Sequence, residues 1–125
     1  MTAPVAINAR AAVRSHIGGV ERVARELTTH LPALRPDRYR VIAPRPGLAY
    51  GRGHAWEQLA LPALTRGSRL ILSPANFAPV ASRRSVVFIH DVAPFLGEWY
   101  GAAYSRWHRL LAPAPRGIGR SLRHV

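Results

Sequence analysis

Short apolar runs alternate with amphipathic segments along this 125-residue chain, and this alternation limits the folds open to it. The runs that predict strands are residues 4–9 (PVAINA), 39–43 (YRVIA), 69–73 (RLILS) and 85–90 (SVVFIH). Strands that alternate with helices favour an α/β fold with a parallel sheet. Right-handed crossovers place helices on both faces of such a sheet. The sequence therefore predicts a Rossmann-like parallel sheet, with residues 1–125 forming one domain.

Three helices are expected between and after these strands. The first runs from Val20 until Pro36 stops it, the second spans residues 56–66, and the third begins near Glu98. On the first helix we expect Glu21/Arg25 and Arg22/Glu26 to pair at i,i+4 spacing on the outer side. The apolar positions expected to be buried are Val20, Val23, Leu27, Leu31 and Leu34 in the first helix, Trp56, Leu59, Leu61 and Leu64 in the second, and Tyr100, Tyr104, Trp107 and Leu111 in the third.

All 18 basic residues are arginines, and with six acidic residues they give a formal net charge of +12. A pI near 11.8 is typical of nucleic-acid-binding proteins. However, the arginines are spread along the whole chain, and only Arg83 and Arg84 are adjacent. No specific nucleic-acid partner is expected, whereas anionic lipid headgroups or phosphorylated substrates fit such a charge better. The absence of cysteine excludes disulfides, thiolate metal sites and a cysteine nucleophile.

The chain carries no pattern of an export signal or a membrane span. Its first residues lack a basic region followed by an apolar one. The longest uncharged stretch, residues 70–82, is interrupted by Pro74 and Pro79 and is shorter than the roughly 18–20 apolar residues that a span needs. We therefore expect a cytoplasmic protein, with at most peripheral contact at the inner face of an anionic membrane.

A functional site is expected at the carboxyl ends of the predicted strands, where open parallel sheets bind their ligands. Gly18 and Gly19 follow the first strand and precede the first helix. Glycines allow close approach to the backbone, and a helix N-terminus attracts phosphate. The alternative is a tight turn that only lets the helix pack on the sheet.

His90 and Asp91 stand at the end of the last apolar strand, where ionisable groups are costly unless they are paired or used. His90 has the chemistry to donate a hydrogen bond to a substrate oxygen or to act as an acid or base near neutral pH. Asp91 has the chemistry to orient His90. The alternative is a satisfied histidine with an Asx turn behind it. His16, in the first loop, either contributes to the same crevice or is a solvated loop residue.

The remaining polar candidates are less specific. Asn76 either binds a sugar hydroxyl or stabilises a turn between two prolines. Glu57 stands near a helix start, where a carboxylate is favourable in any case. The other histidines lack the spacing of metal ligands, so no metal or other cofactor is expected. Neither a nucleophile elbow nor a close carboxylate pair is present.

Five segments in order carry a resemblance to a known family. They are Asn8-Ala-Arg, Gly18-Gly-Val-Glu-Arg-Val-Ala-Arg-Glu-Leu, Trp56-Glu-Gln-Leu-Ala-Leu-Pro, Leu72-Ser-Pro-Ala-Asn-Phe-Ala-Pro and Val87-Phe-Ile-His-Asp-Val-Ala-Pro-Phe. The series, from about Ile7 to Leu111, resembles the N-terminal domain of glycosyltransferase family 4. These are retaining GT-B enzymes that include many bacterial mannosyltransferases and act in polysaccharide biosynthesis.

The resemblance implies a hexosyltransferase built from two Rossmann-like domains that face each other across a cleft. A nucleotide-sugar is then the donor substrate, and a saccharide or lipid-linked molecule is the acceptor. By position, Gly18 and Gly19 approach the donor diphosphate, His90 contacts the transferred sugar, and Asp91 supports that loop. His16 and Asn76 face the acceptor. Such enzymes are usually independent of metals.

The chain departs from this family by ending before the C-terminal donor-binding domain, with its Arg/Lys pair and its paired glutamates. The resemblance therefore implies a truncated N-terminal region that is inactive alone. Two alternatives from other classes remain. One is a non-catalytic α/β module that binds a sugar or a phosphate, and the other is a basic nucleic-acid-binding protein. The donor sugar, the acceptor and the oligomeric state are not determined by the sequence.

Overall fold

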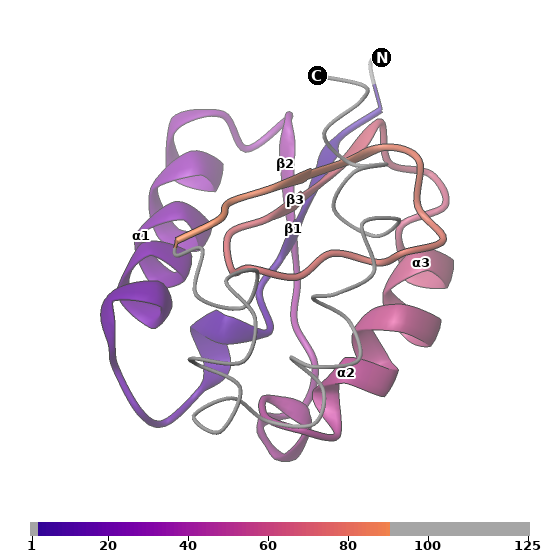
Figure 1. The fold of residues 1–125 in the computed structure, drawn as a ribbon. Helices are drawn as coiled ribbons and strands as arrows, with labels where there is room; N and C mark the ends of the chain where they lie inside the picture. The colour runs from indigo at the N-terminus through magenta and orange to yellow at the C-terminus, as the bar shows by residue number, and fades with distance from the viewer. Residues whose placement is uncertain (1–2, 91–125) are drawn as a thin grey trace.

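A computed structural model describes residues 3–90 of the chain, which form a four-stranded parallel sheet with helices (Figure 1). The strands are β1 (Val5–Asn8), β2 (Tyr39–Ile42), β3 (Leu70–Ser73) and β4 (Ser85–Val87). Their order in the sheet is β2-β1-β3-β4. The α/β fold with a parallel sheet is confirmed. Asp91 and the helix expected from near Glu98 lie outside the described residues.

β1 lies between two neighbours and forms the centre of the core. Val5 is in register with Tyr39 of β2 on one side and with Leu70 of β3 on the other. Ala6 and Ile7 are completely buried, as expected for a strand covered on both faces. The carboxyl end of β1, where Asn8 lies, is therefore flanked by the carboxyl ends of β2 and β3.

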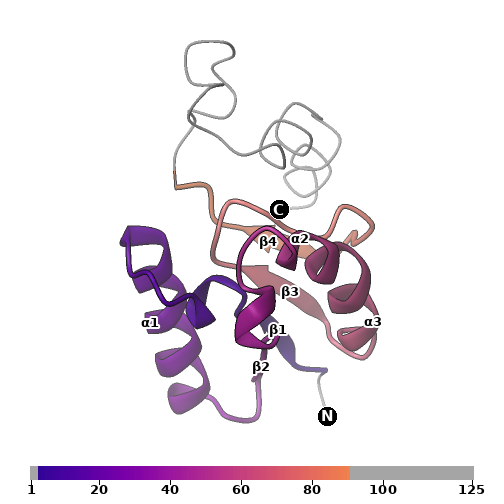
Figure 2. The same ribbon diagram turned by 90° about the horizontal axis from the view of Figure 1, so that it is seen from below.

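Helices cover opposite faces of the sheet, as Figures 1 and 2 both show. α1 (Gly19–Leu34) lies on one face. On the other face, α2 (Gly53–Ala55), the π-helical turn η3 (Trp56–Ala60) and α3 (Leu61–Leu64) follow one another without a break, and we call them helix 53–64. Short 3-10 turns, η1 (Ala11–Val13) and η2 (Pro46–Leu48), lie within the loops predicted after β1 and β2.

The wide turn in helix 53–64 has a local cause. Pro62 has no N–H to donate to the carbonyl of residue 58, and its ring would meet that carbonyl in a regular α-helix. A π turn, in which the N–H of Leu61 donates to the carbonyl oxygen of Trp56 five residues earlier, avoids this conflict. It also changes which side chains face the sheet, because each residue after it is rotated relative to an ideal helix.

Several burial expectations were wrong. Leu61 is buried as expected, but Leu59 and Leu64 are 77% and 52% exposed, and Glu57 is buried in their place. Leu34 is 73% exposed, since it is the last residue of α1. β4 ends at Val87 rather than at residue 90. Of the described helices, none is long and apolar enough to cross a membrane.

The expected ion pairs on α1 are replaced by others. Glu21 lies on the buried side of the helix and pairs with Arg14 of the preceding loop at 2.8 Å. Arg25 instead donates hydrogen bonds to the carbonyl oxygens of Ala12 and Arg14. Glu26 pairs with His30 at the surface. The i,i+4 spacing considers only residues of the helix itself, whereas the actual partners of Glu21 and Arg25 lie in the loop before α1.

Candidate functional site

The chain changes direction within the sheet at β1. From β1 it passes through α1 to β2 on one side, and it then returns across β1 to β3 on the other side. The loops that leave the carboxyl ends of β1 and β3 therefore diverge. In open α/β sheets such a point leaves a crevice outside the strand ends, and ligands bind there.

A buried polar cluster lies at this point and consists of Asn8, Arg10, Glu57 and Ser73. The side-chain amide of Asn8 donates to Oε2 of Glu57 at 2.7 Å and to Oγ of Ser73 at 3.3 Å. Nε of Arg10 lies 3.2 Å from the same Glu57 oxygen. The backbone N–H of Arg10 donates to Oδ1 of Asn8, which holds the loop against the strand end. The cluster joins β1, β3 and helix 53–64.

Glu57 is the centre of this cluster and stands in the π turn of helix 53–64, a type of turn that is frequent at functional sites. Burial lowers the pKa of Arg10, while the negative charge of Glu57 opposes that shift. The guanidinium nevertheless stays charged, because arginine does not lose its proton in proteins. The second oxygen of Glu57, Oε1, has no hydrogen-bond partner among residues 3–90. One carboxylate oxygen is therefore left to accept a hydrogen bond.

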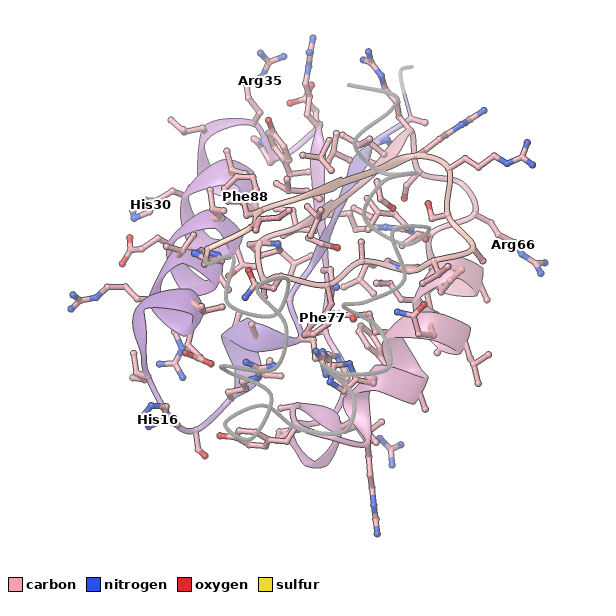
Figure 3. All side chains as sticks on the ribbon, viewed as in Figure 1. His16, His30, Arg35, Arg66, Phe77 and Phe88 are labelled. Atoms are coloured by element: carbon pink, nitrogen blue, oxygen red, sulfur yellow. The ribbon has the colours of Figure 1, made fainter. Side chains whose placement is uncertain are left out.

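The structure brings together two of the predicted site residues, Asn76 and His90. The backbone N–H of His90 donates to Oδ1 of Asn76 at 2.7 Å, so the loops after β3 and β4 are joined. Nε2 of His90 lies 2.6 Å from the carbonyl oxygen of Pro74. His54 of helix 53–64 packs edge-on against Phe77, labelled in Figure 3, with ring centroids 4.9 Å apart.

The contact of His90 with Pro74 determines which ring nitrogen is available. A carbonyl oxygen only accepts hydrogen bonds, so Nε2 must carry the hydrogen. In the neutral ring, Nδ1 is then the atom that accepts a hydrogen bond or a proton. His90 is exposed and lies three residues beyond the end of β4. It can therefore meet a ligand at the carboxyl edge of the sheet.

A second group of predicted residues gathers at the N-terminus of α1. The backbone N–H of Gly18 donates to Oε2 of Glu21 at 3.0 Å, so a carboxylate of the chain itself occupies this helix end. His16 is exposed and points outward in Figure 3. A Cβ on Gly18 would come within 2.9 Å of Glu21, whereas one on Gly19 would meet nothing within 4 Å. No hydrogen bond within residues 3–90 joins this group to Asn76 or His90.

Tyr50 fixes the loop that leads into α1. Its hydroxyl oxygen accepts a hydrogen bond from the backbone N–H of His16 at 3.2 Å and lies 2.9 Å from Oγ of Ser15. These two hydrogen bonds, that from His16 first, lower the pKa of Tyr50. The guanidinium of Arg14 lies over the Tyr50 ring, 5.8 Å from its centroid. The loop from residue 10 to residue 17 is thus held by the segment after β2.

Acid is expected to weaken the anchoring of α1 through Glu21. Burial tends to raise the pKa of Glu21, but hydrogen bonds from Arg14 and from the backbone amides of Glu21 and Gly18 outweigh it, and the pKa is below its ordinary value of 4.5. Because the folded-state pKa is lowered, the stabilisation is complete above the ordinary pKa and is lost as the pH falls through the folded-state value. Urea unfolding of the wild type and Glu21→Gln, followed by circular dichroism between about pH 7 and pH 3, measures this loss.

Glu26→Gln is the matched control for this experiment, because Glu26 is an exposed carboxylate on the same helix. The Glu21→Gln variant should lose less stability between neutral and acidic pH than the wild type, while Glu26→Gln should follow the wild type. Equal acid sensitivity of Glu21→Gln and the wild type would contradict the prediction.

Sequence reasoning missed the buried cluster. Glu57 had only the role of a favourable charge near a helix start, and Asn8 had no site role. Arg10 and Ser73 were included only as the first residues of the loops expected at the functional edge. The available signal was a polar residue at the end of each of two apolar strands, since such residues need partners. Within the described part of the chain, no three histidine, cysteine or carboxylate side chains form a group suited to a metal ion.

Comparison with known proteins gives no relative on which to rest a function. No family model matches the chain, and no curated protein and no solved structure matches it significantly.

Proposed function

We propose that this chain is the acceptor-side part of a retaining glycosyltransferase of the family 4 type, with a Rossmann-like domain that forms half of a GT-B fold. It would help to move a sugar, with mannose as one candidate, from a nucleotide-sugar to a saccharide or lipid-linked acceptor. The observation that carries the proposal is the pairing of Asn76 with His90 at the carboxyl edge of the sheet. The proposal also rests on the sequence segments that resemble this family.

Sugar recognition needs neighbouring hydrogen-bond donors and acceptors, because each hydroxyl can do both. Oδ1 of Asn76 is used by the backbone of His90, which leaves the amide nitrogen with two hydrogens to donate. Nδ1 of neutral His90 supplies an acceptor on the same residue whose backbone binds Asn76. The pair therefore offers what a sugar with adjacent hydroxyls would require.

The described residues fit the binding part of such an enzyme better than its complete catalytic centre. All four carboxylates between residues 3 and 90 already have an arginine or histidine partner, namely Glu21, Glu26, Asp37 and Glu57. Departure of a nucleoside diphosphate needs positive groups placed around it, which in this proposal a second domain supplies. The same observation favours the second candidate, a sugar- or phosphate-binding module without catalysis.

Removing the His90 side chain is expected to weaken sugar binding by about tenfold, since one hydrogen bond is lost. The measurement is titration of the 125-residue chain with monosaccharides and nucleotide-sugars, followed by NMR or calorimetry, for the wild type and His90→Ala. The control is His30→Ala, which removes an exposed histidine on α1 that pairs with Glu26. If His90→Ala and His30→Ala bind equally well, His90 has no part in recognition.

A second measurement separates the enzyme from the binding module. Reading the gene beyond the codon for Val125 shows whether a donor-binding domain follows, and any longer product can be assayed for release of nucleoside diphosphate. A glycosyltransferase should release it in the presence of acceptor and should lose turnover in His90→Ala. Sugar binding without turnover would assign the module instead.

A further inference from the structure

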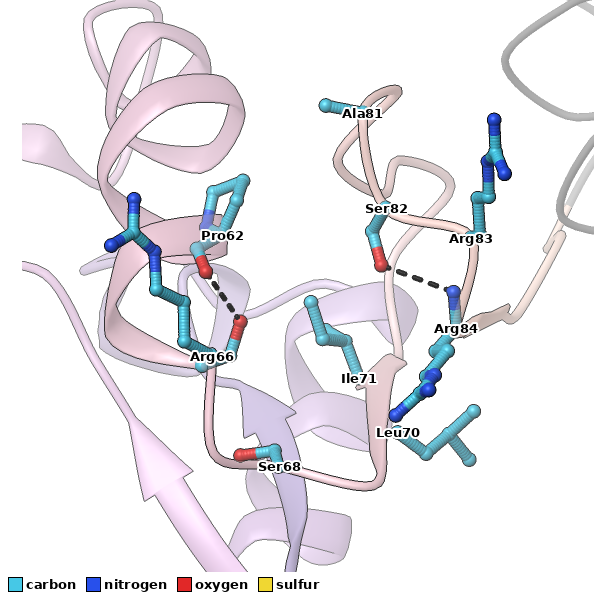
Figure 4. Close-up of a pocket in the computed structure, with 10 residues that line it drawn as sticks. Pro62, Arg66, Ser68, Leu70, Ile71, Ala81, Ser82, Arg83 and Arg84 are labelled. Atoms are coloured by element: carbon cyan, nitrogen blue, oxygen red, sulfur yellow. Dashed lines mark hydrogen bonds between the residues drawn. The ribbon is translucent and has the colours of Figure 1, made fainter.

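We propose that a pocket at the amino ends of the strands, opposite the candidate site, binds a phosphate group. The pocket has a volume of about 300 Å³ and lies between the end of α3 and the loop before β4 (Figure 4). Leu70, the first residue of β3, and Arg84, which precedes β4, both line it, so it opens at the amino ends of these strands. This inference does not depend on the proposed function.

The lining of this pocket is strongly positive. Arg66, Arg83 and Arg84 contribute three guanidinium groups, and no carboxylate is among the lining residues. Every carboxylate between residues 3 and 90 is paired with an arginine or histidine outside the pocket. Within the described part of the chain these three guanidinium groups therefore have no carboxylate partner, and they are available to bind an anion from solution. Guanidinium groups suit phosphate well, because their paired N–H groups match two phosphate oxygens.

Two hydroxyl groups in the pocket are set to donate to an anion. Oγ of Ser82 accepts a hydrogen bond from the backbone N–H of Arg84, and Oγ of Ser68 accepts one from the Arg40 side chain. Each hydroxyl has a single hydrogen, which these contacts leave unused. Thr65 differs, because its hydroxyl donates to the carbonyl oxygen of Leu61 at 2.7 Å. Ser68 and Ser82 thus add neutral donors to the arginines.

The walls of the pocket are held by the backbone, while the arginine side chains are exposed. The carbonyl oxygen of Arg84 accepts a hydrogen bond from the N–H of Ile71, which fixes the loop to β3. In Figure 4, Arg66 and Arg83 extend outward from opposite walls. A dianion at the mouth would draw both side chains toward it. We therefore expect binding that falls as the salt concentration rises.

Calorimetric titration of the 125-residue chain with inorganic phosphate, in a low-salt chloride buffer, tests the proposal. The variant R83A/R84A should bind phosphate at least about tenfold more weakly than the wild type, because it loses two charge-assisted contacts. The matched control, R22A/R45A, removes the same charge from exposed positions outside the pocket and should keep the wild-type affinity. Circular dichroism verifies that both variants are folded.

Two results would overturn the proposal: no saturable phosphate binding by the wild type, or an equal loss of affinity in both variants. The source of the phosphate is resolved with phosphatidylcholine vesicles that contain or lack phosphatidic acid. If the chain binds the phosphatidic acid vesicles, and this binding is abolished in R83A/R84A and displaced by inorganic phosphate, the ligand is a lipid headgroup. If inorganic phosphate binds in the pocket, but vesicle binding is absent or is unaffected in R83A/R84A, the ligand is a soluble phosphate compound.

Discussion

Replacing Gly53 by alanine is expected to lower the free energy of unfolding by at least about 3 kcal/mol, or to prevent folding. A Cβ at this position would lie 1.9 Å from the carbonyl oxygen of Leu48 and 2.8 Å from Cδ of Arg10. The first contact is with backbone, which cannot move aside as the end of a flexible side chain can. Gly53 starts helix 53–64, so the strain would also displace Glu57 from the buried cluster.

Urea unfolding monitored by circular dichroism measures this effect, and Gly19→Ala is the control. Gly19 is the first residue of α1, and a Cβ there would meet nothing within 4 Å. Alanine at that position should stabilise the chain by up to about 1 kcal/mol, since it restricts the unfolded chain without strain. If Gly53→Ala and Gly19→Ala had the same stability, the close packing at Gly53 would be disproved.

Replacing Glu57 by glutamine is expected to cost about 3–5 kcal/mol of stability, because it leaves the Arg10 guanidinium buried without its opposite charge. The side chains of Arg10 and Glu57 are 3% and 2% exposed, so water cannot compensate for the lost partner. The amide that replaces the carboxylate would also present hydrogens toward the donors of Asn8 and Arg10 if it turned the wrong way. Chemical unfolding at neutral pH gives the change in free energy.

The exposed pair of Arg35 and Asp37 supplies the control for this prediction. Its atoms are 3.5 Å apart and its side chains are 53% and 68% exposed, so Asp37→Asn should cost at most about 1 kcal/mol. The double variant Arg10→Met/Glu57→Met should be less destabilised than the sum of the two single changes, because it removes both charges. A cost for Glu57→Gln no larger than that for Asp37→Asn would refute the role of the buried pair.

Strand positions followed closely from the sequence, whereas the burial of helical side chains did so only in part. Each described strand lies within its predicted range, because a short apolar run between turn residues is typical of a buried strand. Helix 53–64 departs from its predicted pattern at Leu59, which is exposed. An ideal helical period placed that residue inward, and the π turn associated with Pro62 changed the phase.

The candidate site was partly predictable for the same kind of reason. The rule that ligands bind at the carboxyl ends of parallel strands selected the loops of His16, Asn76 and His90, and the structure joins the last two by a hydrogen bond. It does not join them to His16 among the described residues. Glu21 was expected to face solvent beside Arg25. Its carboxylate instead accepts hydrogen bonds from the side chain of Arg14 and from the backbone N–H of Gly18 at the start of α1.

By itself the sequence determined the alternation of strands and helices, the α/β class and the excess of arginine, because these depend on local periodicity and composition. Only the tertiary structure decided which polar groups meet. Asn8 and Glu57 are 49 positions apart, and Asn8 and Ser73 are 65 apart. Their contact requires β3 to lie beside β1 while the helix between β2 and β3 crosses the sheet. No local pattern encodes that order, because it results from how all the elements bury their apolar faces together.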